Sequence, residues 1–311
     1  MKPKVYIDGK EGTTGLQIYD RLGSRTDIDL LLIDEDKRKD REERRRFLNA
    51  ADIVFLCLPD AAAREAVELI ENPDTRVIDA STAHRTAAGW IYGFPELSGE
   101  QRQAIAGAKR VANPGCHATG LISSAAPLIR MGILPADYPL TCHSLTGYSG
   151  GGKKMIADYE GEEKRQELYA PRIYGLSLQH KHLPEMQAVT GLAQPPVFCP
   201  IVDDYYKGMA TTIMLHNDRL NGQPSAQDIW EKLAAYYEGQ HFVTVALLGG
   251  TEKMIAANRM AGTNGLELIV CGNEKQTIVT ALFDNLGKGA SGAAVQNMNI
   301  MLGFDEKTGL E

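Results

Sequence analysis

Short apolar runs alternate with a helical pattern through the first third of the chain. The expected strands are residues 4–7, 28–33, 52–58 and 77–78, and the helical pattern follows the first of them at positions 16, 18, 19 and 22. Strands that are apolar at nearly every position are buried on both faces, as in parallel sheets covered by helices. We therefore predict a Rossmann-like, doubly wound α/β domain. The charged run at residues 41–46 is expected to be a solvated helix face or a loop.

The pattern changes after residue 116. The expected strands at residues 211–215, 242–248, 266–270 and 277–283 alternate apolar and polar positions, which is typical of a half-buried antiparallel sheet. A last helix is expected from about residue 290, with Val295, Met298, Met301 and Leu302 along one face. We predict that residues 1–115 and 290–311 form a dinucleotide-binding domain. Residues 116–289 are then an α+β domain with a mostly antiparallel sheet, serving catalysis and oligomerisation.

Composition narrows the class of protein. The 311 residues are 43% hydrophobic and 23% charged, which fits a soluble globular protein. The net charge of −7 argues against a general nucleic-acid binder. No apolar run approaches the ~20 residues of a membrane span, and no signal peptide is seen, so we expect a cytoplasmic protein without a membrane partner.

Cysteine usage fits a reducing compartment. The five cysteines are scattered and form no C-x-x-C pair, so free thiols are expected rather than disulfides or a zinc site. Four of them are interpreted as buried structural residues, namely Cys57, Cys142, Cys199 and Cys271.

A glycine-rich turn joins the first strand to the first helix. Gly9, Gly12 and Gly15 have the spacing G-x-x-G-x-x-G. Glycines let a backbone approach a pyrophosphate, and the helix N-terminus offers N–H donors, so this turn is a candidate dinucleotide site. The alternative is a tight turn with no ligand.

Charged residues of both signs follow the second strand. Asp34 would bind a ribose 2′-hydroxyl group, whereas Arg38 would bind a 2′-phosphate. The local pattern therefore leaves NAD and NADP open.

The run Asn113-Pro114-Gly115-Cys116 lies between a strand end and a helical pattern. Cys116 is thus expected at a helix N-terminus, where the helix dipole lowers the pKa of a thiol. A buried structural cysteine is the alternative, but the Pro-Gly corner favours a nucleophile.

A thiol nucleophile needs a proton partner, and residues 179–185 offer His180, His182 and Glu185. The three-residue spacing from His182 to Glu185 predicts that the carboxylate orients this imidazole. Metal binding by the two histidines is a rival without an evident third ligand. Surface histidines ahead of a helix are the other alternative.

Two stretches are candidates for anion contact. Residues 79–85 follow the fourth strand and carry Ser81 and Arg85, at the edge where such sheets bind ligands. Residues 149–154 combine Ser149 and glycines with Lys153 and Lys154, as in a backbone nest, although a flexible surface loop would have the same composition.

These motifs together resemble the N-acetyl-γ-glutamyl-phosphate reductase family of arginine biosynthesis, in its shorter form. The resemblance covers nearly the whole chain. It is carried by the glycine turn, Asp79-x-Ser81-x-x-x-Arg85, residues 92–97, Asn113-Pro114-Gly115-Cys116, the Ser149 loop, residues 180–185, residues 284–292 and residues 296–299.

The resemblance implies a fold like that of glyceraldehyde-3-phosphate and aspartate-semialdehyde dehydrogenases, with the last helix packed on the cofactor domain. It implies Cys116 as nucleophile, His182 as acid/base aided by Glu185, and NADP as cofactor. Expected cofactor contacts are Gly9, Gly12, Thr13, Thr14, Gly15, Arg38, Pro59, Ser81 and Asn285. Expected substrate contacts are Arg85, Asn113, Ser149 and Lys153, and no metal is expected.

The implied activity is NADPH-dependent reduction of N-acetyl-γ-glutamyl phosphate to N-acetylglutamate 5-semialdehyde and phosphate, through a thioester on Cys116. A homo-oligomer, either dimer or tetramer, is expected. His84 and His117 stand where longer family members carry aromatic residues, which we interpret as changed rim contacts. The alternatives are a reductase of aspartyl phosphate or carrier-linked aminoadipyl phosphate, and a non-catalytic dinucleotide-binding regulator.

Overall fold

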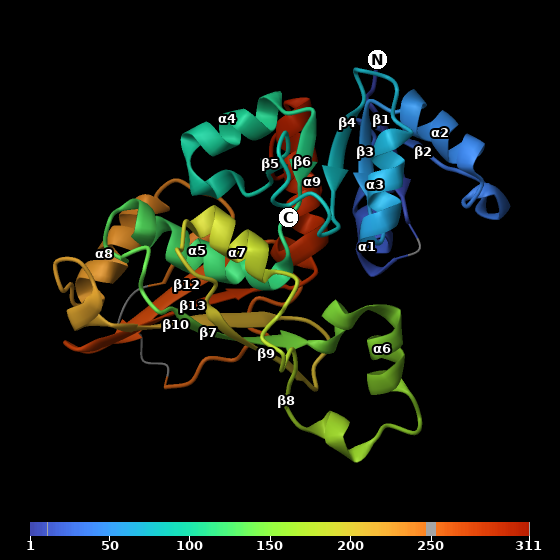
Figure 1. Cartoon of the computed structure of the whole chain (residues 1–311). Coiled ribbons are helices and arrows are strands. Elements are labelled where there is room, and N and C mark those ends of the chain that lie inside the picture. The colour runs from blue at the N-terminus through green and yellow to red at the C-terminus, as the bar shows by residue number, and fades with distance from the viewer. Residues whose placement is uncertain (11, 247–252, 311) are drawn as a thin grey trace. The chain divides into compact units, whose positions relative to one another are not determined.

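The computed structural model describes residues 1–10, 12–246 and 253–310. The chain divides into two compact units. We call Met1–Pro114 with Ala290–Glu311 the N-terminal unit, and Gly115–Gly289 the central unit. The chain therefore leaves the first unit, completes the second, and returns to the first (Figure 1).

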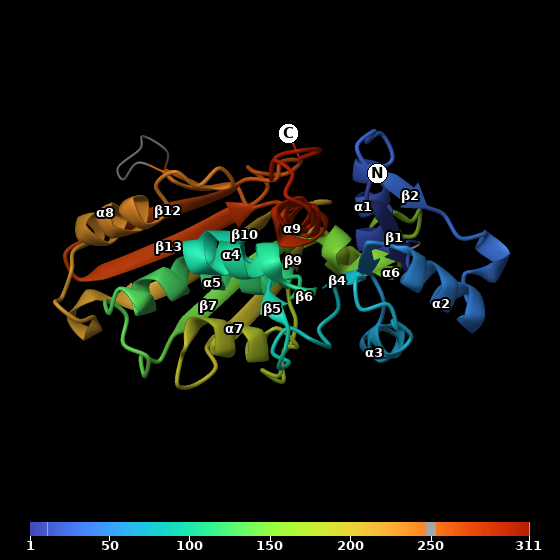
Figure 2. The same cartoon turned by 90° about the horizontal axis from the view of Figure 1, so that it is seen from above.

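The N-terminal unit is built on a six-stranded sheet in the order β2-β1-β3-β4-β6-β5, with every pair parallel. Its strands are β1 (Lys4–Asp8), β2 (Asp29–Leu31), β3 (Ile53–Leu56), β4 (Arg76–Asp79), β5 (Ile91–Tyr92) and β6 (Arg110–Ala112). Its helices are α1 (Thr13–Leu22), α2 (Arg41–Ala50), α3 (Asp60–Glu68), α4 (Gly99–Gly107) and α9 (Gly292–Leu302). Figure 2 shows α1 and α9 on one face of the sheet and α2 and α3 on the other. The predicted doubly wound parallel sheet is confirmed.

Apolar burial explains why these runs form central strands. All four residues of β3 are buried, so the strand must be covered on both faces. On the α2 and α3 face, Tyr6, Val54 and Leu56 pack with Leu48 and Ala66 in one cluster. Removing such side chains from water is the main stabilising contribution to the unit, at about 25 cal/mol per Å² of apolar surface.

The charged run at residues 41–46 is the first turn and middle of α2, so the expected helix face is present, but Arg44 within it is not solvated. Arg44 is buried and its Nη2 atom lies 2.8 Å from Asp8 Oδ2. A buried guanidinium is tolerated because Asp8, at the end of β1, is itself buried and supplies the opposite charge. Sequence pattern shows the polar face of a helix, but not which of its charges has a buried partner.

α9 closes the other face of this unit. It packs on α4, α1 and β4. The single apolar face expected for it is wrong, because Gln296, Asn297 and Asn299 are as buried as Val295 and Met298. Buried amides persist only when they are hydrogen-bonded. The Gln296 side chain donates to Glu96, and the Asn299 side chain accepts from Arg25.

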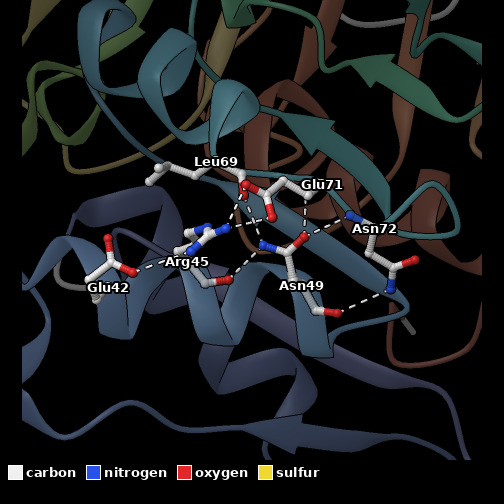
Figure 3. Close-up of polar contacts among 6 residues, drawn as sticks. All are labelled: Glu42, Arg45, Asn49, Leu69, Glu71 and Asn72. Atoms are coloured by element: carbon white, nitrogen blue, oxygen red, sulfur yellow. Dashed lines mark hydrogen bonds and ion pairs between the residues drawn. The ribbon is translucent and has the colours of Figure 1, made fainter.

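A polar cluster ties the end of α2 to the loop after α3 (Figure 3). The Asn49 amide donates to the Leu69 carbonyl at 2.8 Å, and its oxygen accepts from the backbone N–H groups of Glu71 and Asn72 at 2.7 Å. The guanidinium of Arg45 pairs with Glu71. The cluster precedes β3 and β4 in the chain, so it braces the amino edge of the sheet, opposite the edge where parallel sheets bind ligands.

The central unit contains a seven-stranded mixed sheet in the order β11-β12-β13-β10-β7-β9-β8. Its strands are β7 (Thr141–Gly147), β8 (Arg172–Ile173), β9 (Val197–Asp203), β10 (Met209–His216), β11 (Val243–Val245), β12 (Leu266–Gly272) and β13 (Gln276–Phe283). Its helices are α5 (Cys116–Arg130), α6 (Gly152–Glu160), α7 (Leu183–Thr190) and α8 (Ala226–Tyr236). Helices α5, α7 and α8 lie along one face of this sheet (Figure 1).

The sheet is mostly antiparallel, as predicted, but two pairs are parallel. β7 pairs in parallel with β9, and β11 with β12. The expected strand 242–248 is present as β11, while residues 247 and 248 lie outside the described residues. Strands β7, β8 and β9 were not predicted from the sequence.

α5 is the central helix of this unit. It packs on β10, β13, α7 and α8. Gly120 permits the close approach, because a Cβ atom there would overlap the Thr211 side chain of β10. Among the described residues, no helix combines the length and apolar character needed to cross a membrane.

Candidate active site

The glycine turn of the N-terminal unit has little room for side chains. Gly9 has φ +89°, and a Cβ atom on it would overlap the carbonyl oxygen of Cys57 at the end of β3. A Cβ atom on Gly15 would overlap the carbonyl oxygen of Gly9. Gly12 is the N-cap residue of α1, so the helix begins with Thr13 directly after the turn. Glu11, within the turn, lies outside the described residues.

A cavity of about 440 Å³ adjoins this turn. Gly9 and Lys10 form one part of its wall, and Leu58 and Ala62 form an apolar part. Its lining also includes Glu35, Arg38, Lys39, Arg44, Asp8, Tyr6, Tyr19 and residues 30–33. The cavity thus has an apolar wall, two exposed cations (Arg38 and Lys39) and the turn that leads into a helix N-terminus. This combination suits the adenosine and phosphate parts of a dinucleotide.

The acidic alternative for ribose recognition lies elsewhere. Asp34 is outside the cavity lining, and its carboxylate is 3.9 Å from Lys37. Arg38 does line the cavity, with its guanidinium 3.7 Å from Glu35.

Other expected cofactor contacts lie at the same sheet edge. Pro59 is the N-cap residue of α3, directly after β3, and Ser81 follows β4. The Ser81 hydroxyl donates to Asp79 Oδ2 at 2.7 Å, and its backbone N–H donates to Asp79 Oδ1 at 2.9 Å. The carboxyl ends of β1, β3 and β4 thus carry Gly9, Pro59 and Ser81, as expected for a parallel sheet.

Arg85 and Asn113 contact each other in this unit. Arg85 Nε donates to the Asn113 carbonyl at 3.0 Å, and Nη2 donates to the Ala80 carbonyl at 3.1 Å. The Asn113 side chain donates to the Ala290 carbonyl and accepts from Asn297. Both groups of this amide therefore serve internal contacts that fix the segment leading to Cys116.

The interpretation of His84 and His117 as rim residues is wrong. His84 is buried, its Nδ1 atom lies 2.6 Å from Asp79 Oδ2, and its ring stacks on Trp90 at 4.1 Å. His117 is buried in the central unit, and burial lowers its pKa to about 3. Both imidazoles are held by hydrogen bonds inside their own unit, His84 through Nδ1 and His117 through both ring nitrogen atoms.

Cys116 is the first residue of α5, with Gly115 as the N-cap residue. The thiol is therefore placed where the helix dipole favours a thiolate. The other four cysteines lack this position, and only Cys142 among them is buried, so the expectation of four buried thiols is only partly correct. All five thiols are free.

Glu185 reaches the corner that carries Cys116. Its Oε2 atom accepts a hydrogen bond from the backbone N–H of Gly115 at 3.1 Å, across 70 positions of sequence. The carboxylate is almost fully buried. Glu185 thus positions the start of α5 directly, a contact that its spacing from His182 did not predict.

The two histidines lie close together beside α5. His182 is buried and is the N-cap residue of α7, and its ring is 4.7 Å from that of His180. The backbone N–H of His182 donates to His180 Nδ1 at 3.2 Å. A neutral His180 therefore carries its proton on Nε2 and acts as a donor. Among the described residues, no group of three or more His, Cys, Asp or Glu side chains could hold a metal ion.

Tyr174 is a residue of this site that the sequence pattern did not single out. Its hydroxyl lies 2.6 Å from His117 Nε2, and its ring is 6.1 Å from that of His180. It follows the two-residue strand β8, which has no readable alternation. A single aromatic residue six positions before a histidine gives no periodic signal.

Ser149 and Asn285 come together elsewhere in the central unit. The Asn285 amide donates to Ser149 Oγ at 3.0 Å, and its oxygen accepts from the Gly208 N–H at 2.8 Å. The stretch 149–154 is not a flexible loop, because it forms a 3₁₀ turn and the start of α6. Lys153 is exposed on the first turn of that helix.

Family models match both parts of the chain. Residues 33–106 match the NAD-binding domain of semialdehyde dehydrogenases, and residues 116–285 match the semialdehyde dehydrogenase dimerisation domain. The chain therefore has a nicotinamide-dinucleotide-binding domain and a domain of a type named for dimerisation.

Curated relatives match over nearly the full length. An N-acetyl-gamma-glutamyl-phosphate reductase 2 from Nostoc is 49% identical, covering 99% of both chains. An N-acetyl-gamma-glutamyl-phosphate reductase from Chelativorans is 50% identical, covering 97% of this chain and 99% of the relative.

Solved structures agree on the fold. Aspartate semialdehyde dehydrogenase II from Vibrio cholerae, complexed with ASA, has a TM-score of 0.75 at 14% identity, covering 97% of this chain and 98% of that one. Aspartate semialdehyde dehydrogenase with NADP from Candida albicans has a TM-score of 0.65 at 15% identity, covering 97% and 99%.

Proposed function

The chain belongs to the semialdehyde dehydrogenase family, and within it to the N-acetyl-gamma-glutamyl-phosphate reductases, and from this premise we propose that it catalyses the reductive dephosphorylation of N-acetyl-γ-glutamyl phosphate. The products are N-acetylglutamate 5-semialdehyde and phosphate, and the step belongs to arginine biosynthesis. The observation that carries the proposal is Cys116 at the start of α5, with Glu185 on the preceding N–H and two histidines on the same side.

Cys116 is the nucleophile in this proposal. Its thiolate attacks the acyl carbon of the substrate, the C–O bond to phosphate breaks, and phosphate leaves with the bonding electron pair, giving a thioester. The nicotinamide cofactor, when bound, supplies the hydride that reduces this thioester. A thiohemiacetal on Cys116 then collapses, the C–S bond breaks, and the aldehyde is released.

His182 moves the proton. It takes the proton from the Cys116 thiol and returns it as the sulfur leaves the product. His180 is less suited to accept a proton at Nδ1, since that atom accepts the N–H of His182 at 3.2 Å. His180 instead donates from Nε2 to an oxygen atom of the substrate.

The negative groups of the substrate need positively charged side chains to bind them. Arg85 is our choice for the negative groups of the substrate, because two backbone carbonyls hold its guanidinium in place. Lys153, exposed on α6, is the second cation for this role, and Ser149 is a further substrate contact. Asn285, which donates to Ser149, is the proposed cofactor contact in this unit.

NADP is the proposed cofactor. The glycine turn and the start of α1, with Thr13 and Thr14, would bind the pyrophosphate, and Arg38 in the cavity wall would bind the 2′-phosphate. Asp34 would have to turn toward the cavity for NAD to be preferred. Arg38→Ala should raise KM for NADPH about tenfold or more and leave KM for NADH nearly unchanged in steady-state kinetics, because only NADPH carries the 2′-phosphate.

Self-association is proposed through the central sheet. Residues on the face opposite α5 alternate as half-buried or exposed apolar side chains, including Val197, Leu145, Met214 and Ile278. Such a face is stabilised by a second copy of the chain, as a dimer or a tetramer. We place the protein in the cytoplasm, where free thiols and the proposed substrate fit.

The reverse reaction tests the proposal. Purified protein with N-acetylglutamate 5-semialdehyde, phosphate and NADP⁺ should generate NADPH absorbance, and Cys116→Ser should abolish it because a serine hydroxyl is not ionised at neutral pH. Cys199→Ser is the matched control and should stay active. His182→Ala should cost about 10²–10⁴-fold in kcat.

Two results would change the assignment. Preference for aspartyl phosphate or a carrier-linked aminoadipyl phosphate in the forward assay would assign a neighbouring reductase. Dinucleotide binding with no turnover of any acyl phosphate would assign a regulator.

A further inference from the structure

The Cys116 site contains a chain of polar groups that the proposed reaction does not use. In the central unit, Thr211 Oγ1 lies 2.7 Å from Ser144 Oγ, and Ser144 Oγ lies 2.8 Å from His117 Nδ1. His117 Nε2 lies 2.6 Å from the Tyr174 hydroxyl. Four side chains from β10, β7, α5 and the end of β8 therefore form one continuous hydrogen-bonded chain.

The fold fixes the positions of these four hydrogen-bonded side chains. Sheet register places Ser144 directly opposite Thr211, and the absence of a side chain on Gly120 lets α5 approach Thr211. The Tyr174 backbone N–H donates to the Pro200 carbonyl of β9 at 3.0 Å. Ser144 and Thr211 are fully buried. Buried networks of this kind are kept only when their members satisfy one another.

The proton of the His117 ring can be on either nitrogen atom, but the ring does not carry a positive charge. Burial lowers its pKa to about 3, so the ring is neutral at neutral pH. A neutral imidazole has one N–H donor and one acceptor nitrogen. In one proton order Tyr174 donates to Nε2 and Nδ1 donates to Ser144. In the other order every donor is reversed, from Thr211 toward Tyr174.

The second order leaves the Tyr174 O–H proton for a further acceptor. Cys116 is the neighbour of His117 in the first turn of α5. Burial raises the pKa of the Tyr174 hydroxyl, and the nearby Cys116 raises it further, so the hydroxyl lies within electrostatic reach of the sulfur atom. A negative sulfur atom favours the order in which all four donors point toward it.

We propose that Tyr174 is a further catalytic residue, whose hydroxyl donates a hydrogen bond to the Cys116 thiolate and is oriented by His117, Ser144 and Thr211. The chain of donors stabilises the nucleophile in its ionised form before substrate arrives. This proposal rests on Cys116 as the nucleophile of the proposed function. Ser144 and Thr211 act through His117 and are positioning residues.

The test measures ionisation of Cys116 without substrate or cofactor. The rate of alkylation by iodoacetamide is followed from pH 5 to 10 by mass spectrometry of the Cys116 peptide. Tyr174→Phe should raise the pKa of the Cys116 thiol by about one unit, because a hydrogen bond to the charged form is lost. Alkylation at pH values below that pKa then slows about tenfold. Ser144→Ala should shift the pKa in the same direction by less.

Tyr138→Phe is the matched control. Tyr138 is also buried in the central unit, and its hydroxyl accepts from the His216 N–H at 2.8 Å. It should leave the titration of Cys116 unchanged. The other titratable groups around the site are unchanged in every variant, namely His180, Lys181, His182 and Glu185.

A second test uses the unmodified protein and determines which nitrogen atom of His117 carries the proton. The nitrogen-15 spectrum of His117 should show a protonated Nε2 and an unprotonated Nδ1 at a pH where Cys116 is ionised. The proposal is overturned by a protonated Nδ1, by an unchanged thiol pKa in Tyr174→Phe, or by an equal shift in Tyr138→Phe. If Tyr174→Phe does not fold, the nitrogen-15 spectrum of His117 and the thiol pKa in Ser144→Ala test the proposal instead.

Failure of the reaction and failure of the hydrogen-bonded chain give different results. If the protein does not turn over the proposed substrate but shows the expected shift in alkylation, the role of Tyr174 stands. Only the assignment of the substrate is then refuted. Full activity of Cys116→Ser would remove the covalent mechanism whatever the titration shows.

Discussion

Replacing Asp8 by Ala should destabilise the N-terminal unit strongly. Asp8 and Arg44 are both buried, and the carboxylate receives Arg44 Nη2 at 2.8 Å and Nε at 3.2 Å. Removing the carboxylate leaves a guanidinium in the interior with Glu65 as its remaining ion-pair neighbour at 3.9 Å. Breaking a buried pair from one side costs about 3–5 kcal/mol. Because Glu65 retains part of the attraction, we expect the lower end, about 3 kcal/mol.

Removing both charges should cost much less. Burial raises the pKa of the Asp8 carboxyl, although Arg44 acts in the opposite direction, so desolvation consumes most of the attraction between the two groups. The double variant Asp8→Ala with Arg44→Met should therefore recover most of the loss, with a free energy of unfolding within about 1–2 kcal/mol of the original protein. Both residues line the cofactor cavity, so dinucleotide affinity should fall in each variant.

Urea unfolding followed by tryptophan fluorescence measures this. The chain has two tryptophans, and Trp90 packs against the cluster that contains Tyr6 and Leu48, so a Trp230→Phe background reports on the N-terminal unit. Asp36→Ala is a matched control, because it removes an exposed carboxylate from the same unit. A single variant that loses less than about 1 kcal/mol, or a double variant as unstable as the single, would refute the reasoning.

Three further predictions concern the site. Glu185→Ala should lower the free energy of unfolding by about 1–3 kcal/mol, because the Gly115 N–H loses its acceptor, whereas Glu185→Gln should retain most of it in the same urea assay. Gly9→Ala should weaken dinucleotide binding at least tenfold by calorimetry, because φ is +89° and the new methyl group meets the Cys57 carbonyl. The folded pKa of His117 is about 3 against an ordinary 6.5, so its contribution to stability is lost as pH falls from 6.5 toward 3. His117→Gln should flatten the pH dependence of unfolding by about 1.4 kcal/mol per pH unit between pH 6 and 4, and equal slopes would contradict this.

Much of the N-terminal unit could be predicted because its strands are buried on both faces and read as apolar runs. The inward side of β7 is different, since it carries Cys142, Ser144 and Thr146. Two of these buried side chains are polar and form hydrogen bonds. The sequence therefore does not alternate between apolar and polar residues here, and no strand was predicted. The partner that explains Ser144 is Thr211, far along the chain, and no local pattern shows such a pair.

The same distinction holds for the site. The Pro-Gly corner predicted Cys116 at a helix start because capping is local, and the structure has the helix start there. The contact from Glu185 to Gly115 and the neighbours of Tyr174 depend on how β8, α7 and α5 pack together. Those contacts arise only after the chain has folded, which is why spacing along the sequence did not predict the contact from Glu185 to Gly115.

The return of α9 to the N-terminal unit has a consequence for biosynthesis. Arg76, at the start of β4, donates to the Met301 carbonyl, and Arg25 donates to the Asn299 side chain. A ribosome delivers these partners only after the whole central unit has been made. On this face the sheet that begins the chain therefore has α1 but not α9 until the central unit has been synthesised, so the N-terminal unit cannot complete its fold first, in contrast to the usual N-terminal-first order. During that interval the part of β4 that α9 later covers stays exposed, which is the kind of apolar surface that chaperones bind.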